Sequence, residues 1–151
     1  MNLLIIKFFN LLLSGLMAGT LFGIWIGYNP KHLSAETYVE QLQSSINALN
    51  TLMPILGLIT IILTLTAAFM QKQNQAVFLT LLISASLLIA GGLITKFGNQ
   101  PINTIVMTWD KHHVPDNWML LRDKWWYLHT IRMLTTVISF CLIIASNIKR
   151  I

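Results

Sequence analysis

Four residues towards the C-terminus have side chains that can bind anions or transfer protons, and their spacing along the chain brings these side chains together. Arg122, Trp125, His129 and Arg132 follow one another at steps of three, four and three residues, which places them on one face of a helix. An imidazole titrates near neutral pH and can act as base, acid or metal ligand. The pattern therefore predicts a functional face made of two cations, an indole and an imidazole.

The surrounding stretch, residues 99–132, concentrates the polar and aromatic side chains of an otherwise apolar chain. It holds four of the five Trp, three of the four His and three of the five acidic residues. The Trp residues form either an interfacial belt or the walls of a pocket for a planar aromatic ligand. The second interpretation uses Trp109, Trp118, Trp125 and Trp126, with Asn99 and Asn103 as the polar groups that orient the ligand.

Composition indicates a small integral membrane protein. Of the 151 residues, 55% are hydrophobic and only 10% are charged, whereas soluble domains carry roughly 25% charged residues. Cys141 is the only cysteine, which excludes an intrachain disulfide and a dithiol relay. The net charge of +5 is spread over positions that flank apolar runs, so we expect a lipid bilayer and no nucleic acid as partner.

The elements that must position the functional face are helices that cross a membrane. Apolar runs long enough to span a core of roughly 30 Å predict an all-α, four-helix membrane bundle in a single domain, residues 1–151. The predicted spans are residues 3–28, 52–70, 76–94 and 126–148. A Trp- and His-rich connection, residues 96–124, precedes the fourth span.

An extra amphipathic helix is predicted between the first two spans, over residues 34–50. Ser34 is its N-cap, and Tyr38, Leu42 and Ile46 share one face. The helix lies on the membrane surface or folds over the bundle. Its polar residues Gln41, Gln43 and Asn47 either reach the ligand site or are solvated.

Glycines recur every four residues along the first span, at Gly15, Gly19, Gly23 and Gly27. Small residues at this spacing let another helix approach closely. They predict tight helix packing or a homo-oligomer contact, with a substrate groove as the alternative.

The even number of spans places both termini on one side of the membrane. Lys and Arg residues flank the spans in nearly equal numbers on the two sides, so the positive-inside rule separates the two orientations only weakly. We expect an inner-membrane protein of a bacterium, with cytoplasmic termini.

Arg132 lies inside the fourth predicted span, about two turns from Trp126 at about 1.5 Å per residue. An ionisable residue at that depth is a functional candidate by default, and the alternative is a structural bond to a carbonyl. Asp110, His112 and His113 supply too few converging ligands for a metal site, so no metal is predicted. No cofactor is expected, although a single axial histidine such as His129 leaves haem open.

These motifs resemble one membrane family. The matching motifs extend over essentially the whole chain: Gly15–Gly19, Met53-Pro54, Pro101-x-Asn103, Trp109, Trp118, Leu121-Arg122, Trp125, His129 and Arg132. Together they are similar to the signature of the anthrone-oxygenase-like family. Two departures concern the substrate more than the fold: Trp126 replaces an acidic residue, and Asp123-Lys124 replaces a more basic run.

The resemblance implies a four-helix bundle that oxidises an anthrone or another planar aromatic or phenolic compound with O₂ and without an established cofactor. It implies a site made of Asn103, Trp109, Arg122, Trp125, His129 and Arg132. On this hypothesis His129 accepts a proton from the activated carbon, and Arg122 or Arg132, with Asn103, stabilises the enolate oxygen. The alternative is a non-catalytic membrane subunit that binds a lipid, a quinone or haem.

Overall fold

The computed structural model describes residues 2–148, and every regular element within this range is helical. The ends of the predicted domain, Met1 and residues 149–151, lie outside the described residues. Four helices are long and apolar enough to cross a membrane, which confirms the predicted four-helix membrane bundle. The elements in chain order are α1 (Leu3–Gly27), η1 (Pro30–His32), α2 (Ala35–Leu49), α3 (Leu52–Met70), α4 (Gln75–Ile94), η2 (Thr95–Asn99), α5 (Gln100–Val106) and α6 (Trp118–Ile148).

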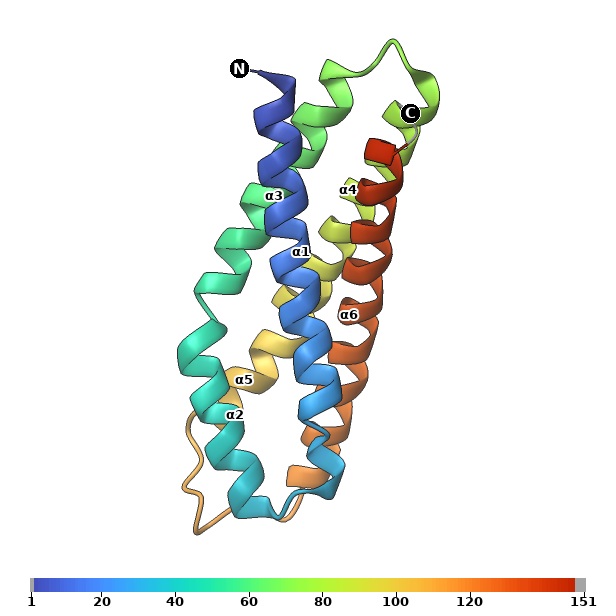
Figure 1. Ribbon diagram of the computed structural model, residues 1–151. Helices are drawn as coiled ribbons and strands as arrows, with labels where there is room; N and C mark the ends of the chain where they lie inside the picture. The colour runs from blue at the N-terminus through green and yellow to red at the C-terminus, as the bar shows by residue number, and fades with distance from the viewer. Residues whose placement is uncertain (1, 149–151) are drawn as a thin grey trace.

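The four long helices form a closed ring in which each packs against two neighbours. α1 contacts α3 and α6, and α4 contacts α3 and α6. The start of α1, the turn between α3 and α4, and the end of α6 lie together at one end (Figure 1). We call η1, α2, α5 and residues 107–117, which lie at the other end, the cap.

Local sequence signals fix several helix boundaries. The side chain of Asn2 accepts a hydrogen bond from the backbone N–H of Leu4 at the start of α1, and Asn74 accepts one from Val77 at the start of α4. Ser34 caps α2 through the N–H of Thr37, as predicted. These caps satisfy backbone donors that have no partner inside their helices.

The molecule contains two separate apolar cores. One lies within the membrane bundle, at the end near the termini, and consists of Ile6, Ala67, Ala68, Val77, Leu81 and Ile143. The other joins the cap to the start of α6 and consists of Tyr38, Val39, Leu42, Ile46, Ile102, Val106 and Trp125. The predicted apolar face of α2 is therefore buried against α5 and α6, and α2 folds over the bundle rather than along the membrane surface.

The connection before the last helix is shorter than the sequence pattern indicates. α6 begins at Trp118, whereas the apolar run begins near Trp126. The first two turns of α6 pack Trp118, Leu121 and Trp125 against the cap. Their other side exposes both apolar and charged residues, namely Met119, Leu120, Asp123 and Lys124. Hydropathy therefore detects only the part of the helix that is apolar all round.

A π-helical turn joins α4 to α5. Residues Thr95–Asn99 form this wider turn, which places one more residue in the helix than regular α-helical geometry would. Gly98 lies against α6: a Cβ atom there would stand 2.9 Å from Cδ1 of Leu128. Asn99 is fully buried, and its side-chain amide donates to the carbonyl of Trp125 at 3.1 Å.

The glycine stripe of α1 faces two different environments. A Cβ atom at Gly15 would stand 3.3 Å from the ring of Phe140 on α6, so this glycine permits close packing inside the bundle. Gly19, Gly23 and Gly27 have nothing within 4 Å of such an atom and are exposed. Only the first of the four glycines therefore serves helix packing within the described chain.

We expect Gln43→Leu to lower the stability of the cap by about 1–3 kcal/mol. The amide of Gln43 donates to the carbonyls of Val106 and Trp109, at 2.9 and 3.0 Å, and leucine would leave both acceptors without this donor. The measurement is thermal unfolding in detergent. Gln41→Leu, two residues away at an exposed position, is the control. Equal midpoints for the two variants would contradict the prediction.

Candidate functional site

His129 is held inside the junction between bundle and cap. It is fully buried and stacks on Trp125, with ring centroids 5.2 Å apart, and on Trp126, at 5.6 Å. Arg132 donates to its Nδ1 atom from both Nε, at 3.2 Å, and Nη2, at 3.0 Å. A guanidinium group can only donate, so Nδ1 is the acceptor and the neutral ring carries its proton on Nε2.

The second ring nitrogen of His129 has no hydrogen-bond partner among the described residues. The backbone of Leu21 on α1 lies near the ring. His129 therefore presents an occupied lone pair on one side and an N–H group without an acceptor on the other.

Arg132 is the cation of this site, and it has only neutral neighbours in the described chain. Besides His129, it donates from Nη1 to the hydroxyl of Thr95 at 3.4 Å, and its guanidinium carbon lies 6.0 Å from the centre of the Trp125 ring. No carboxylate between residues 2 and 148 forms an ion pair with it. A partly buried cation with neutral partners is well suited to binding an anion.

Two asparagines hold Trp125 in place. The indole Nε1 of Trp125 donates to the side-chain oxygen of Asn103 at 2.9 Å, and Asn99 binds its carbonyl. Asn103 also donates to the side chain of Asn50 at 3.4 Å. Asn103 therefore fixes the indole that stacks on His129, and Asn99 holds the backbone of Trp125. The ligand-orienting role expected from the sequence stays a prediction for both asparagines.

Two cavities meet at Arg132. The larger, of about 220 Å³, lies between the bundle helices and is mostly apolar; we call it the bundle cavity. The smaller, of about 50 Å³, lies under α2 and is called the cap cavity. Both are lined by Leu21, Met53, Pro54, Thr95 and Arg132. Because an apolar cavity of about 150 Å³ accepts benzene, the bundle cavity has room for a ring system.

The predicted site residues fall into three groups in the structure. Asn99, Asn103, Trp125, Trp126, His129 and Arg132 come together, and Asn103, Trp125 and Arg132 also line the cap cavity. Trp109 and Trp118 pack in the core of the cap. Gln41 lines a separate groove between α1 and α2, and Asn47 is exposed on α2.

Arg122 belongs to a different layer from Arg132. Ten residues of helix separate the two arginines by about 15 Å. The guanidinium carbon of Arg122 lies 4.8 Å from the centre of the Trp118 ring, and its Nε donates to Asp123 at 2.9 Å. Trp118 in turn packs on Tyr38, where burial raises the pKa of the phenol and Arg122 partly offsets this effect.

Several residues of the site were not predicted from the sequence. Thr95, Lys96 and Gln100 line the bundle cavity together with Gly91 and Gly92. One signal was available: Thr95, Asn99 and Asn103 recur every four residues, as polar residues on one helix face do.

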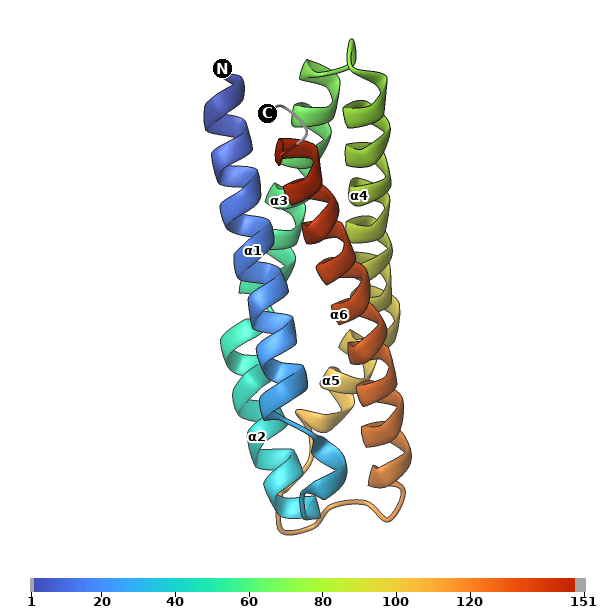
Figure 2. The same cartoon turned by 45° about the vertical axis from the view of Figure 1, so that its right-hand side comes forward.

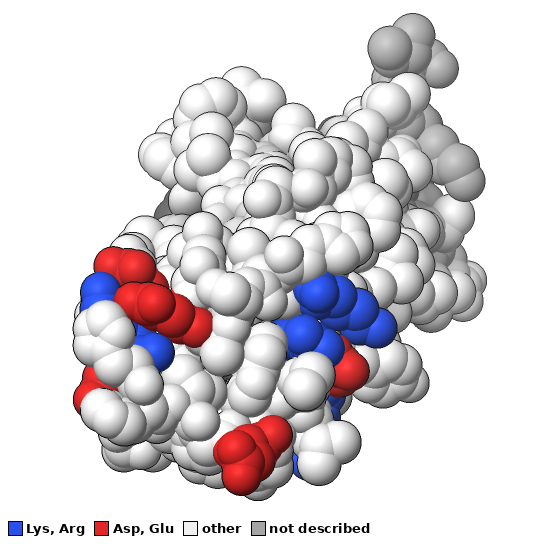
Figure 3. Space-filling model, turned by 90° about the horizontal axis from the view of Figure 1, so that it is seen from below, with Lys and Arg blue, Asp and Glu red and all other residues white. Residues whose placement is uncertain are grey.

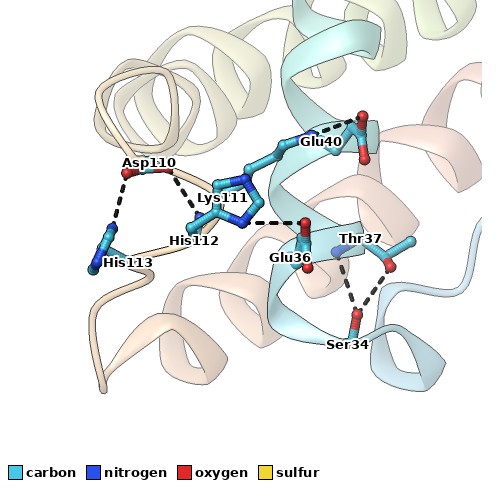
Figure 4. A network of polar contacts seen from close by, with 8 residues as sticks. All are labelled: Ser34, Glu36, Thr37, Glu40, Asp110, Lys111, His112 and His113. Carbon is cyan, nitrogen blue, oxygen red and sulfur yellow. Dashed lines mark hydrogen bonds and ion pairs between the residues drawn. The ribbon is translucent and has the colours of Figure 1, made fainter.

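Of the two adjacent histidines in the connection, His112 contacts α2 and His113 contacts Asp110 beside it. His112 lies 3.4 Å from Glu36, Lys111 lies 3.3 Å from Glu40, and His113 pairs with Asp110 at 2.9 Å (Figure 4). Hydrogen bonds from the His112 backbone and the His113 ring lower the pKa of Asp110. No group of three potential ligand side chains (His, Cys, Asp or Glu) forms a metal site within residues 2–148.

The charged side chains of the cap lie on its surface. Viewed from the cap end, Asp and Glu alternate with Lys and Arg around the molecule (Figure 3). All five acidic residues of the chain are exposed and belong to the cap or the first turns of α6, namely Glu36, Glu40, Asp110, Asp116 and Asp123. They therefore cannot neutralise a cation within the bundle.

A haem group does not fit the surroundings of His129. Its Nε2 atom is the nitrogen that an axial ligand would offer. However, two indoles stack on the ring, and His129 does not line either cavity at the junction. The ring thus has no open side towards a porphyrin.

Fold and site together define a membrane protein with four long apolar helices, capped at one end, with an Arg–His pair at the junction. A model of the anthrone oxygenase family matches residues 43–142, about two-thirds of the chain and all of the junction residues on α4–α6. The chain belongs to this family, which confirms the resemblance found in the sequence. No curated protein and no solved structure matches it significantly.

Proposed function

We propose that this protein is a membrane oxygenase that converts a planar phenolic substrate of the anthrone type into a quinone with O₂. The observation that carries the proposal is the position of Arg132 in the wall of both cavities. A cation there that has no carboxylate partner among residues 2–148 can stabilise a substrate oxygen as it becomes negatively charged. Membership of the anthrone oxygenase family supports the choice of substrate.

The first step removes a proton from the methylene carbon opposite the carbonyl group of the anthrone. The electron pair of the broken C–H bond delocalises onto the carbonyl oxygen, and Arg132 donates hydrogen bonds to the resulting enolate. Arg132 covers Nδ1 of His129 and itself lines both cavities. When Arg132 turns from His129 to this oxygen, it opens the buried Nδ1 lone pair towards the substrate, and this lone pair takes the proton. His129 is thus a base only when substrate occupies Arg132.

O₂ then oxidises the electron-rich carbanion. The methylene group loses four electrons in total and becomes a carbonyl group. One oxygen atom of O₂ enters this carbonyl and the other leaves as water, so anthrone and O₂ yield anthraquinone and H₂O. Trp125 contributes an aromatic wall beside Arg132, and the two asparagines keep that wall in place.

Oxygen uptake by the purified protein tests this function. The protein in lipid nanodiscs is mixed with 1,8-dihydroxyanthrone, and O₂ consumption and quinone absorbance are recorded together. We expect one O₂ consumed per quinone formed, without H₂O₂, at a rate well above that of protein-free nanodiscs. An anthrone that binds but is oxidised no faster than in the empty discs would instead indicate a non-catalytic aromatic-binding bundle.

A further inference from the structure

The bundle cavity opens sideways, between α3 and α4. These two helices pack closely near the turn that joins them and diverge towards the cap (Figure 2). Four residues that line the cavity are also exposed on the outer surface of the bundle: Pro54, Leu58, Gly92 and Lys96. Because α3 and α4 are candidate membrane spans, we expect the opening to face the bilayer.

Two cations line this mostly apolar cavity. Arg132 lies at its inner end and Lys96 at its opening. Lys96 forms no ion pair with any residue between 2 and 148, and the acidic side chains all lie at the cap surface. The 20 residues of α4 cross about 30 Å at about 1.5 Å per residue. Lys96 therefore stands at the membrane interface, level with lipid headgroups.

This combination selects a ligand with two parts. The apolar walls, from Met17, Gly57, Ile61 and Leu88, suit a hydrocarbon or aromatic body. The two cations suit an anionic oxygen, since hydrogen bonds between charged groups are the stronger ones. A neutral ligand would leave both cations without a counter-charge.

We infer that the bundle cavity binds a lipophilic acid that enters from the bilayer, with its carboxylate or phenolate group bound by Lys96 and Arg132. The choice of an aromatic body for this acid rests on the proposed function, whereas its charge follows from the cavity itself. Lys96 is then a specificity-determining residue, which selects acidic over neutral molecules at the opening.

Equilibrium binding without turnover tests this inference. The probes are anthracene-9-carboxylate, 9-anthracenemethanol and (anthracen-9-ylmethyl)trimethylammonium, which share one ring system and differ in charge. Energy transfer from the Trp residues to the anthracene ring reports binding to protein in phosphatidylcholine nanodiscs, and empty discs give the correction for partitioning. We expect the carboxylate to bind about tenfold more tightly than the alcohol, and the cation to bind weakest.

Two pairs of variants locate the site. Lys96→Gln should remove most of the preference for the carboxylate, whereas Lys72→Gln, in the turn at the other end of the same helix pair, should keep it. Gly57→Leu should weaken the binding of every probe, because Gly57 lines the cavity and a Cβ atom there would stand 3.4 Å from Cε of Met17, which lines the cavity as well. Gly23→Leu, on the exposed face of α1, is its control.

The outcomes distinguish a preference for anionic ligands from the proposed oxygenase activity. Equal affinities for the three probes, or a Lys96→Gln variant with unchanged preference, would overturn the inference even if the protein oxidises anthrones. Selective binding of the carboxylate without O₂ uptake would support the acid site and reject the oxygenase. Displacement of the carboxylate probe in phosphatidylglycerol nanodiscs would keep the anion site and identify a lipid phosphate as a source of the anion.

Discussion

Replacing Arg132 with glutamine should lower kcat/KM for the anthrone at least about 100-fold, the loss typical when an oxyanion donor is removed. Glutamine still offers an amide N–H group to His129 or Thr95, but it carries no charge to stabilise the enolate. The measurement is the rate of quinone formation by protein in nanodiscs, with thermal unfolding recorded in parallel. We expect the folded protein to persist, because the variant removes a charge from an apolar bundle.

Arg122→Gln is the matched comparison for this result. Arg122 lies on the same helix face but in the layer of Trp118, and it lines neither the bundle cavity nor the cap cavity. We expect a loss of less than about tenfold, because the Arg122 guanidinium lies about 15 Å along the helix from Arg132 and is already paired with Asp123. A larger effect of Arg122→Gln than of Arg132→Gln would place the reacting oxygen in the cap and contradict the proposed site.

Substitution of His129 should be equally severe, and the choice of replacement separates two roles. Glutamine offers an amide oxygen that can accept the hydrogen bonds of Arg132, but it cannot take up a proton at neutral pH. Alanine removes both functions and two stacking contacts. If His129 is the proton acceptor, both variants should lose about 10²–10⁴-fold in kcat.

A different pattern would assign His129 a purely positioning role. In that case His129→Gln would retain near-normal kcat because Arg132 stays in place, while His129→Ala would not. The pH dependence of kcat gives a second readout. A proton acceptor adds an acidic limb to the profile that is lost in His129→Gln, and a positioning residue leaves the profile unchanged.

The spacing of residues along α6 predicted which face of the helix each side chain lies on, but not which surroundings it meets at its level along the helix. Arg122, Trp125, His129 and Arg132 do share a face, yet only the last of them is a cation that lines both cavities. Steps of three and four residues fix the angle of a side chain. They do not reveal which neighbouring helix, indole or asparagine that side chain will meet, so the two arginines could not be ranked.

The architecture was easier to predict because it depends on composition over long stretches. Apolar runs identified the four long helices, and the spacing of Tyr38, Leu42 and Ile46 identified the buried face of α2. The pairing of Asn103 with the Trp125 indole depends on a contact between α5 and α6 that leaves no local pattern. The burial of His129 likewise results from the packing of α1 against α6. The sequence alone could not predict this burial, because a histidine at this position could equally be exposed to solvent.

The π-helical turn at Thr95–Asn99 determines the register between the membrane helix α4 and the short helix α5. Each residue of an α-helix turns the chain by about 100°. Removing one residue from this turn would let α4 run straight into α5 and would rotate Asn103 away from the indole of Trp125. A difference of one residue in the length of this segment therefore decides whether the aromatic wall beside Arg132 is fixed, independently of the identity of any side chain.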